Sequence, residues 1–240
     1  MKIKIAISIL LIVVAGFGFY FLKSNRQKVN LAKGILALNS DKQIYIPGET
    51  VHLQIAALDP QGHTICNADL ELLINGQKTG GIKNSSTCGD GNVTGNPDYF
   101  YDIKIDRTGN YSIKLTDNTT GQIAKNQFSV VASREVDIVR ETATRINPLK
   151  AERYPVKLIV TATKDFQGEI SDIIPAGFTI PWQGPAKVTD NGDKGKVITW
   201  QVDIKAGETK ELIYEYSAPK TGPAIYKIGN NSEWQIVATK

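Results

Sequence analysis

The hydrophobic pattern of the chain begins with one long apolar segment and then changes to short alternating runs. Residues 5–22, from Ile5 to Leu22, contain no charged side chain. As an α-helix this segment would extend about 27 Å at 1.5 Å per residue, which is close to the hydrocarbon thickness of a bilayer. The pattern therefore predicts an N-terminal transmembrane helix that contacts the membrane. We expect the rest of the chain to lie on the far side of that membrane.

Basic residues flank the apolar segment on both sides, namely Lys2, Lys4, Lys23, Arg26 and Lys28. A cleaved signal peptide also has a basic start, but its shorter apolar centre ends at a cleavage site of small residues. Residues 14–16 (Val-Ala-Gly) offer such a site, yet a bulky apolar run follows them. This favours an uncleaved anchor, with a cleaved signal and a buried helix as the open alternatives.

After the anchor, apolar and polar positions alternate in short runs. Val51, Leu53 and Ile55 have polar neighbours at 52 and 54, and the same alternation recurs around Ile198 and Trp200. A period of two predicts strands with one buried face. Turn signals about every 8–12 residues are typical of β-sandwiches. We therefore predict an all-β protein with two tandem β-sandwiches after the transmembrane helix.

The domain boundaries follow from where these runs stop. Residues 1–30 are assigned to the membrane anchor (or signal peptide) and a polar tether. Residues 31–133 are predicted to form the first sandwich and residues 134–240 the second. The division lies at Ser133 and Arg134, where one run ends and a polar step precedes Val136.

Turns in the first predicted sandwich have recognisable chemistry. Pro47-Gly48 suits a type II turn, because proline sets φ at its first central position and glycine accepts a positive φ at the second. Residues 106–111 resemble the turn into strand F of immunoglobulin-like domains, where a tyrosine, here Tyr111, packs at the corner. The position two residues later is Ile113, so the antibody-type core disulfide is absent.

Residues 41–62 (DKQIYIPGETVHLQIAALDPQG) resemble the opening strands of macroglobulin-type domains and bacterial Ig-like modules. This resemblance implies an extracellular sandwich. It does not imply a protease trap, because that activity needs a Cys-Gly-Glu-Gln thioester. The chain has Cys88-Gly89-Asp90-Gly91 instead.

A second resemblance covers residues 170–180 (ISDIIPAGFTI) and 197–219 (VITWQVDIKAGETKELIYEYSAP). Together they resemble the Ig-like conserved repeat domain of bacterial and archaeal surface proteins. The resemblance implies an Ig-like or fibronectin-type sandwich that serves as a spacer or adhesive module in envelope proteins, and with the first resemblance it makes the expected fold two tandem Ig-like or fibronectin-type β-sandwiches. It brings no catalytic residues with it.

The charge distribution argues against nucleic acid as a partner. The formal net charge is +4, but the first 30 residues hold five basic residues and no acidic ones. The remainder is close to neutral, so the two predicted sandwiches carry no excess of cations to follow a phosphate backbone.

The two cysteines, Cys66 and Cys88, are a candidate disulfide, because both fall in one domain of an exported chain. Closing a loop of about 23 residues is worth about 3 kcal/mol in the chain-entropy model. Zinc bound by His63, Cys66, Cys88 and Asp90 is the alternative, although its spacing is incomplete. The glycine-rich loop after Cys88 also offers Asp90, Asn92 and Asp98 as candidate calcium ligands.

The remaining candidate chemistry is sparse. The histidines, His52 and His63, accompany no nucleophile motif, and no phosphate-binding or dinucleotide fingerprint occurs. Residues 190–193 (Asp-Asn-Gly-Asp) read as a hairpin turn, with a metal site as the alternative. Trp182 is a candidate exposed aromatic for sugar or protein contact, or else packs over the end of the sandwich.

These features predict a protein of the cell membrane that crosses it once, with the residues after about position 30 on the extracytoplasmic side. We expect a structural or adhesive role through binding to a protein or glycan, with no enzyme activity and no cofactor. Association with other envelope proteins fits the same reading. The alternative is a secreted, soluble glycan- or peptide-binding protein that forms when a signal peptide is removed.

Overall fold

A computed structural model of the chain describes residues 26–27, 31–89, 97–150, 152–231 and 233–239. Within these ranges the protein forms 20 strands and two short 3-10 turns, η1 (Leu31–Lys33) and η2 (Gly192–Lys194). The predicted all-β class is therefore confirmed for this part of the chain. No helix in the described ranges has the length and apolarity to cross a bilayer, and the predicted transmembrane segment, residues 5–22, lies outside them.

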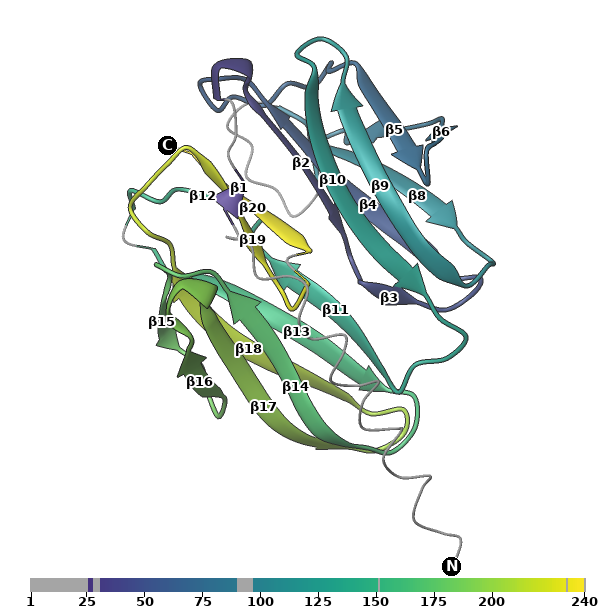
Figure 1. Cartoon of the computed structure of the whole chain (residues 1–240), viewed down its shortest axis with the longest axis vertical. Helices are drawn as coiled ribbons and strands as arrows, with labels where there is room; N and C mark the ends of the chain where they lie inside the picture. Colours follow the sequence, from purple (N-terminus) through teal and green to yellow (C-terminus); the bar gives the residue numbers. More distant parts are fainter. Residues whose placement is uncertain (1–25, 28–30, 90–96, 151, 232, 240) are drawn as a thin grey trace, which may run out of the picture.

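The first sandwich occupies residues 35–130 (Figure 1). Its strands are β2 (Ile35–Ser40), β3 (Ile44–Tyr45), β4 (Thr50–Leu58), β5 (Leu70–Ile74), β6 (Gln77–Thr79), β7 (Lys83–Asn84), β8 (Tyr99–Lys104), β9 (Gly109–Asp117) and β10 (Gln122–Val130). One sheet has the order β2-β4-β8-β7, and the facing sheet has the order β3-β10-β9-β5-β6. Alternate residues of the long strands, such as Val51, Leu53 and Ile55, fill the core between the two sheets.

The second sandwich occupies residues 136–238. Its strands are β11 (Val136–Thr142), β12 (Arg145–Ile146), β13 (Tyr154–Ala162), β14 (Phe166–Ile174), β15 (Thr179–Trp182), β16 (Lys187–Asp190), β17 (Lys196–Ile204), β18 (Thr209–Ser217), β19 (Ala224–Ile228) and β20 (Trp234–Ala238). Two of its sheets have the orders β11-β13-β18-β15 and β14-β17-β16. Trp200, one of the apolar positions of the predicted alternation, is buried between them.

A third sheet of the second sandwich contains the C-terminal hairpin, which we define as β19 and β20. Its order is β1-β19-β20-β12, where β1 is Arg26–Gln27. The backbone of β1 pairs with Ile225 and Tyr226 of β19, so two residues of the predicted tether belong to a sheet. Gly229 N, in the turn of the hairpin, donates to Ile173 O of β14 at 2.8 Å. The hairpin thus borders the edge of β14 and extends the second sandwich.

Local sequence explains several turns. Gly48 has a φ of +86° and Glu49 N donates to Ile46 O, which closes the predicted Pro47-Gly48 turn. Tyr111 Oη donates to Arg107 O at 2.8 Å, as the predicted tyrosine corner requires. Gly34 precedes β2 with a φ of +88°, and a Cβ atom there would lie 2.1 Å from Leu58 O. Only glycine therefore permits β2 to begin this close to the end of β4.

Truncation of one hairpin residue tests whether the hairpin belongs to the second core. Ile236 is fully buried in that core, so Ile236→Ala should lower the free energy of unfolding by roughly 2–5 kcal/mol. The matched control is Ile123→Ala on β10, whose side chain is exposed and whose loss should change stability by less than about 0.5 kcal/mol. Urea unfolding followed by tryptophan fluorescence measures both, and equal losses would contradict this packing.

Candidate functional site

The two sandwiches meet along a buried apolar contact that we call the seam. It consists of Ile35, Ala37 and Leu58 from the first sandwich and Ile225 and Val237 from the C-terminal hairpin. Every residue of β2 and of β20 is buried. Successive residues of a strand point to opposite faces, so these strands each pack against their own core on one face and against the other sandwich on the opposite face.

The seam also contains a pair of buried amide side chains, Asn39 on β2 and Gln235 on β20. Asn39 Nδ2 donates to Gln235 O at 3.0 Å, and Asn39 Oδ1 accepts from Gln235 N at 2.7 Å. Gln235 in turn bonds Leu38 N through Oε1 and Lys125 O through Nε2. The amide of Asn39 therefore takes the place of a strand backbone and aligns β20 with β2. Because buried polar groups are costly unless paired, this pairing holds one register between the sandwiches.

A second polar feature, the charged cluster, lies at the edge of the second sandwich beside the hairpin. Arg140 of β11 forms two hydrogen bonds to the fully buried carboxylate of Asp172 on β14, at 2.6 and 2.7 Å. Tyr214 Oη donates to the same carboxylate at 2.9 Å, and Arg140 Nη2 lies 3.3 Å from Glu233 Oε1. These contacts tie β11, β14, β18 and the hairpin together.

The pKa values of three side chains in the charged cluster are raised. Burial alone would lower the pKa of Arg140, but the charge and hydrogen bonds of Asp172 outweigh this and raise it. Burial raises the pKa of Tyr214 well above its ordinary value, and burial also raises the pKa of Glu233. The arginine and the phenol therefore stay protonated near neutral pH, and their contacts orient strands.

A third polar group, the linker network, joins the sandwiches where the chain passes from one to the other. Arg134 binds Glu49 in a two-pronged contact, with Nη2 2.6 Å from Oε1. Lys42 Nζ lies 3.3 Å from Glu49 and 2.8 Å from Asp137, and Arg134 also pairs with Asp137. The hydrogen bonds from Arg134 lower the pKa of Glu49 to about 2. Positive and negative groups from both sandwiches thus alternate around the linker.

Cys66 and Cys88 are joined by a disulfide, with their Cα atoms 5.8 Å apart. Neither sulfur is then free to bind zinc, and His63 Nδ1 instead lies 3.0 Å from Asp59 Oδ2. Of the calcium candidates, Asp90 and Asn92 lie outside the described residues. Asp98 is half-buried, and burial raises its pKa. Among the described residues, no three His, Cys, Asp or Glu side chains gather where a metal ion would fit.

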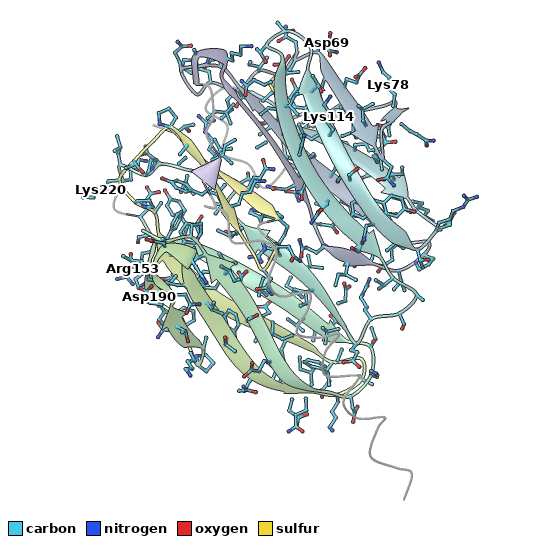
Figure 2. All side chains as sticks on the ribbon, viewed as in Figure 1. Asp69, Lys78, Lys114, Arg153, Asp190 and Lys220 are labelled. Carbon is cyan, nitrogen blue, oxygen red and sulfur yellow. A yellow bond between two sulfur atoms is a disulfide. The ribbon has the colours of Figure 1, made fainter. Side chains whose placement is uncertain are left out.

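The other candidates lie apart from one another on the surface. Trp182 is 46% exposed on β15, the last strand of its sheet, and its ring borders Gly184. His52 is exposed and lies 2.8 Å from Asp102. Asp190, which Figure 2 labels on the second sandwich, accepts from Gly192 N at 2.9 Å, as expected of the predicted turn.

The seam, the charged cluster and the C-terminal hairpin are absent from the sequence-based predictions. One signal for the hairpin exists: residues 234–238 (WQIVA) and 35–38 (ILAL) are nearly continuous apolar runs. Such runs are typical of strands buried on both faces. Nothing in the sequence pairs Arg140 with Asp172, because these residues lie 32 positions apart and no pattern between them indicates the contact.

No protein-family model matches the chain, and no curated protein matches its sequence. Among solved structures, an alpha-2-macroglobulin from Escherichia coli is 14% identical, with a TM-score of 0.33 over 87% of this chain and 15% of that one. The Escherichia coli adhesin FdeC is 16% identical, with a TM-score of 0.29 over 92% of this chain and 65% of that one.

A third structure, the chitinase ChiA74 from Bacillus thuringiensis, is 12% identical, with a TM-score of 0.27 over 75% of this chain and 26% of that one. The chain thus spans between 15% and 65% of the length of these three proteins. At such identities and TM-scores, none of their activities transfers to this chain.

Removing the cation of the charged cluster should unfold the second sandwich far more easily. Arg140→Ala leaves the carboxylate of Asp172 buried without its counter-charge, a change that costs roughly 3–5 kcal/mol. The control is Lys157→Ala on the neighbouring strand β13, whose partners Glu141 and Glu211 are exposed and whose loss should cost less than about 1 kcal/mol. Thermal and urea unfolding measure both variants, and a loss for Arg140→Ala as small as the control would refute the structural role.

The linker network should make stability depend on pH in the acid range. Glu49 has a folded-state pKa near 2 against an ordinary value of 4.5, so its contribution is complete above 4.5 and is lost as the pH falls toward 2. Glu49→Gln should therefore lower the melting temperature at pH 6 and leave it nearly unchanged at pH 2. A constant difference between the two proteins from pH 6 to pH 2 would contradict this assignment.

Proposed function

We propose that the chain is a membrane-anchored, extracytoplasmic structural or adhesive protein that acts by binding, without catalysis. The observation that carries this proposal is the seam. Domains that share a chain ordinarily move relative to one another unless their interface is hydrophobic and extensive. Here the sandwiches are joined by strands buried on both faces, by the hydrogen-bonded amides of Asn39 and Gln235, and by the linker network. The protein is therefore suited to hold binding surfaces at a defined distance and angle.

The disulfide supports an extracytoplasmic location, because disulfides persist in oxidising compartments and are rare in the cytosol. The apolar residues 5–22 supply the anchor. The residues after position 30 carry nearly equal numbers of basic and acidic side chains, which suits a surface exposed to solvent. In this proposal each sandwich is of the Ig-like or fibronectin type, for which the tyrosine corner at Tyr111 is the best local support. Its partners are a protein or glycan and other envelope proteins.

The secreted alternative shares the same folded portion and differs only in whether the apolar segment, residues 5–22, stays attached to it. The exposed ring of Trp182 on an edge strand favours a glycan- or peptide-binding role in either case. The two forms are therefore separated by the N-terminus of the mature protein. An anchor keeps residues 5–22, whereas signal cleavage removes most of them.

Sidedness tests the proposal directly. The full chain with a flexible C-terminal tag should lose that tag when protease is added to intact cells whose outer layers admit the enzyme. The double variant Val13→Arg, Val14→Arg should fail to insert, because an arginine at the centre of a membrane helix costs about 2.5–3.5 kcal/mol per residue. Its tag should therefore stay inside the cell and be protected. Full protection of the unmodified chain would overturn the proposed orientation.

N-terminal sequencing of the membrane fraction completes this experiment. A sequence that starts at Met1 or Lys2 agrees with the uncleaved anchor. A sequence that starts after residues 14–16, with the protein in the medium, replaces the anchor with the secreted alternative.

A further inference from the structure

An open groove of about 380 Å³ lies between the two sheets of the first sandwich. It is bordered by three successive residues of β6, Gln77–Thr79, and by residues 103–105, which comprise the last two residues of β8 and the one after it. Because successive residues of a strand point to opposite faces, a groove that contacts all of them borders the strand edges.

Both edges are open in the described part of the chain. β6 is the last strand of its sheet. β7 pairs only with Tyr99 and Phe100 of β8, so residues 101–104 have no strand neighbour on that side. Unpaired backbone groups at such edges are templates for another extended chain.

The groove is held in shape before any ligand arrives. Asn75, in the β5–β6 turn, accepts a hydrogen bond from Ser112 N at 2.8 Å. Tyr111 holds the backbone of Arg107 on the other side through the tyrosine corner. Ile74 and Ile105 form a buried apolar floor. Both walls are therefore fixed to β9, and such rigidity reduces the entropy lost when a ligand binds.

Cations outnumber anions around the groove. Lys78, Lys104 and Arg107 line it, against Asp106 alone. Lys78, labelled in Figure 2, already pairs with Glu71 at 2.5 Å. Lys104 and Arg107 are exposed, and their side chains make no hydrogen bond or ion pair within the described residues. Two cations beside open strand edges are complementary to an acidic, extended ligand.

We propose that this groove binds an acidic peptide segment of a partner protein in the extended conformation. The peptide adds as a strand to one of the open edges, so that its backbone supplies affinity. A carboxylate side chain then lies beside Lys104 and Arg107, which selects acidic sequences. The inference rests on the proposed binding function and assigns it a partner class.

The test uses the full chain in detergent micelles and a fluorescent ten-residue peptide of alternating glutamate and valine. Fluorescence anisotropy should show binding that weakens about tenfold in the double variant Lys104→Glu, Arg107→Glu. The matched control is Lys187→Glu on the edge strand β16, which should bind as the unmodified protein does. Circular dichroism melting curves verify that all variants are folded.

A second peptide examines the strand-addition geometry. N-methylation of alternate backbone amides removes the donors that pair with a strand edge, so this peptide should not bind.

Equal binding of the methylated peptide, unchanged binding by the double variant, or no binding of the acidic peptide would each overturn the proposal. Binding of a polygalacturonate oligomer in place of the peptide would overturn it in favour of an acidic saccharide. None of these outcomes alters the protease result, so the anchored module is judged separately.

Discussion

β2 and the C-terminal hairpin are each buried on both faces, and this double burial sets how the two sandwiches are arranged. β2 contributes Leu36 and Leu38 to the first core and Ile35 and Ala37 to the seam. The C-terminal hairpin contributes Ile236 to the second core and Val237 to the seam. Neither element can leave one environment without exposing the other, because both apolar faces belong to the same strands. The hydrophobic effect thus couples the position of one sandwich to that of its neighbour.

Polar groups at this junction add direction to an otherwise non-directional attraction. Apolar contacts alone tolerate sliding of one sandwich over the other, whereas the Asn39–Gln235 pair is satisfied in one register. The charged cluster acts in the same way between the sheets of the second sandwich, since Asp172 is fully buried and needs Arg140 and Tyr214 in place. Order at the junction therefore comes from hydrogen bonds, and cohesion comes from apolar burial.

The way in which strand edges are covered or left open connects the rigid junction to the proposed binding function. The edge of β14 is covered by the hairpin turn, where Asn230 Nδ2 donates to Ser171 O at 2.9 Å. Outer strands elsewhere carry Lys78, Lys83, Pro181 or Lys187, residues that discourage uncontrolled pairing. Beside the groove of the first sandwich, the lysine of β6 is neutralised by Glu71, and the remaining cations select what approaches. The proposed binding function needs such control over which edges stay available.

The sequence alone was enough to predict the all-β class, the period-two strands and the local turns, because these depend on contacts within a few residues. Val51 to Ile55, Pro47-Gly48 and the corner at Tyr111 could all be predicted this way. It did not reveal β2, the hairpin or the cluster of Arg140, Asp172 and Glu233, whose partners are distant in the chain. A nearly continuous apolar run, such as residues 35–38 or 234–238, is typical of a strand buried on both faces, but it does not indicate what covers each face. Which surfaces meet follows from the complete fold, because the free energy of burial depends on the neighbours that the fold brings together and not on their order along the chain.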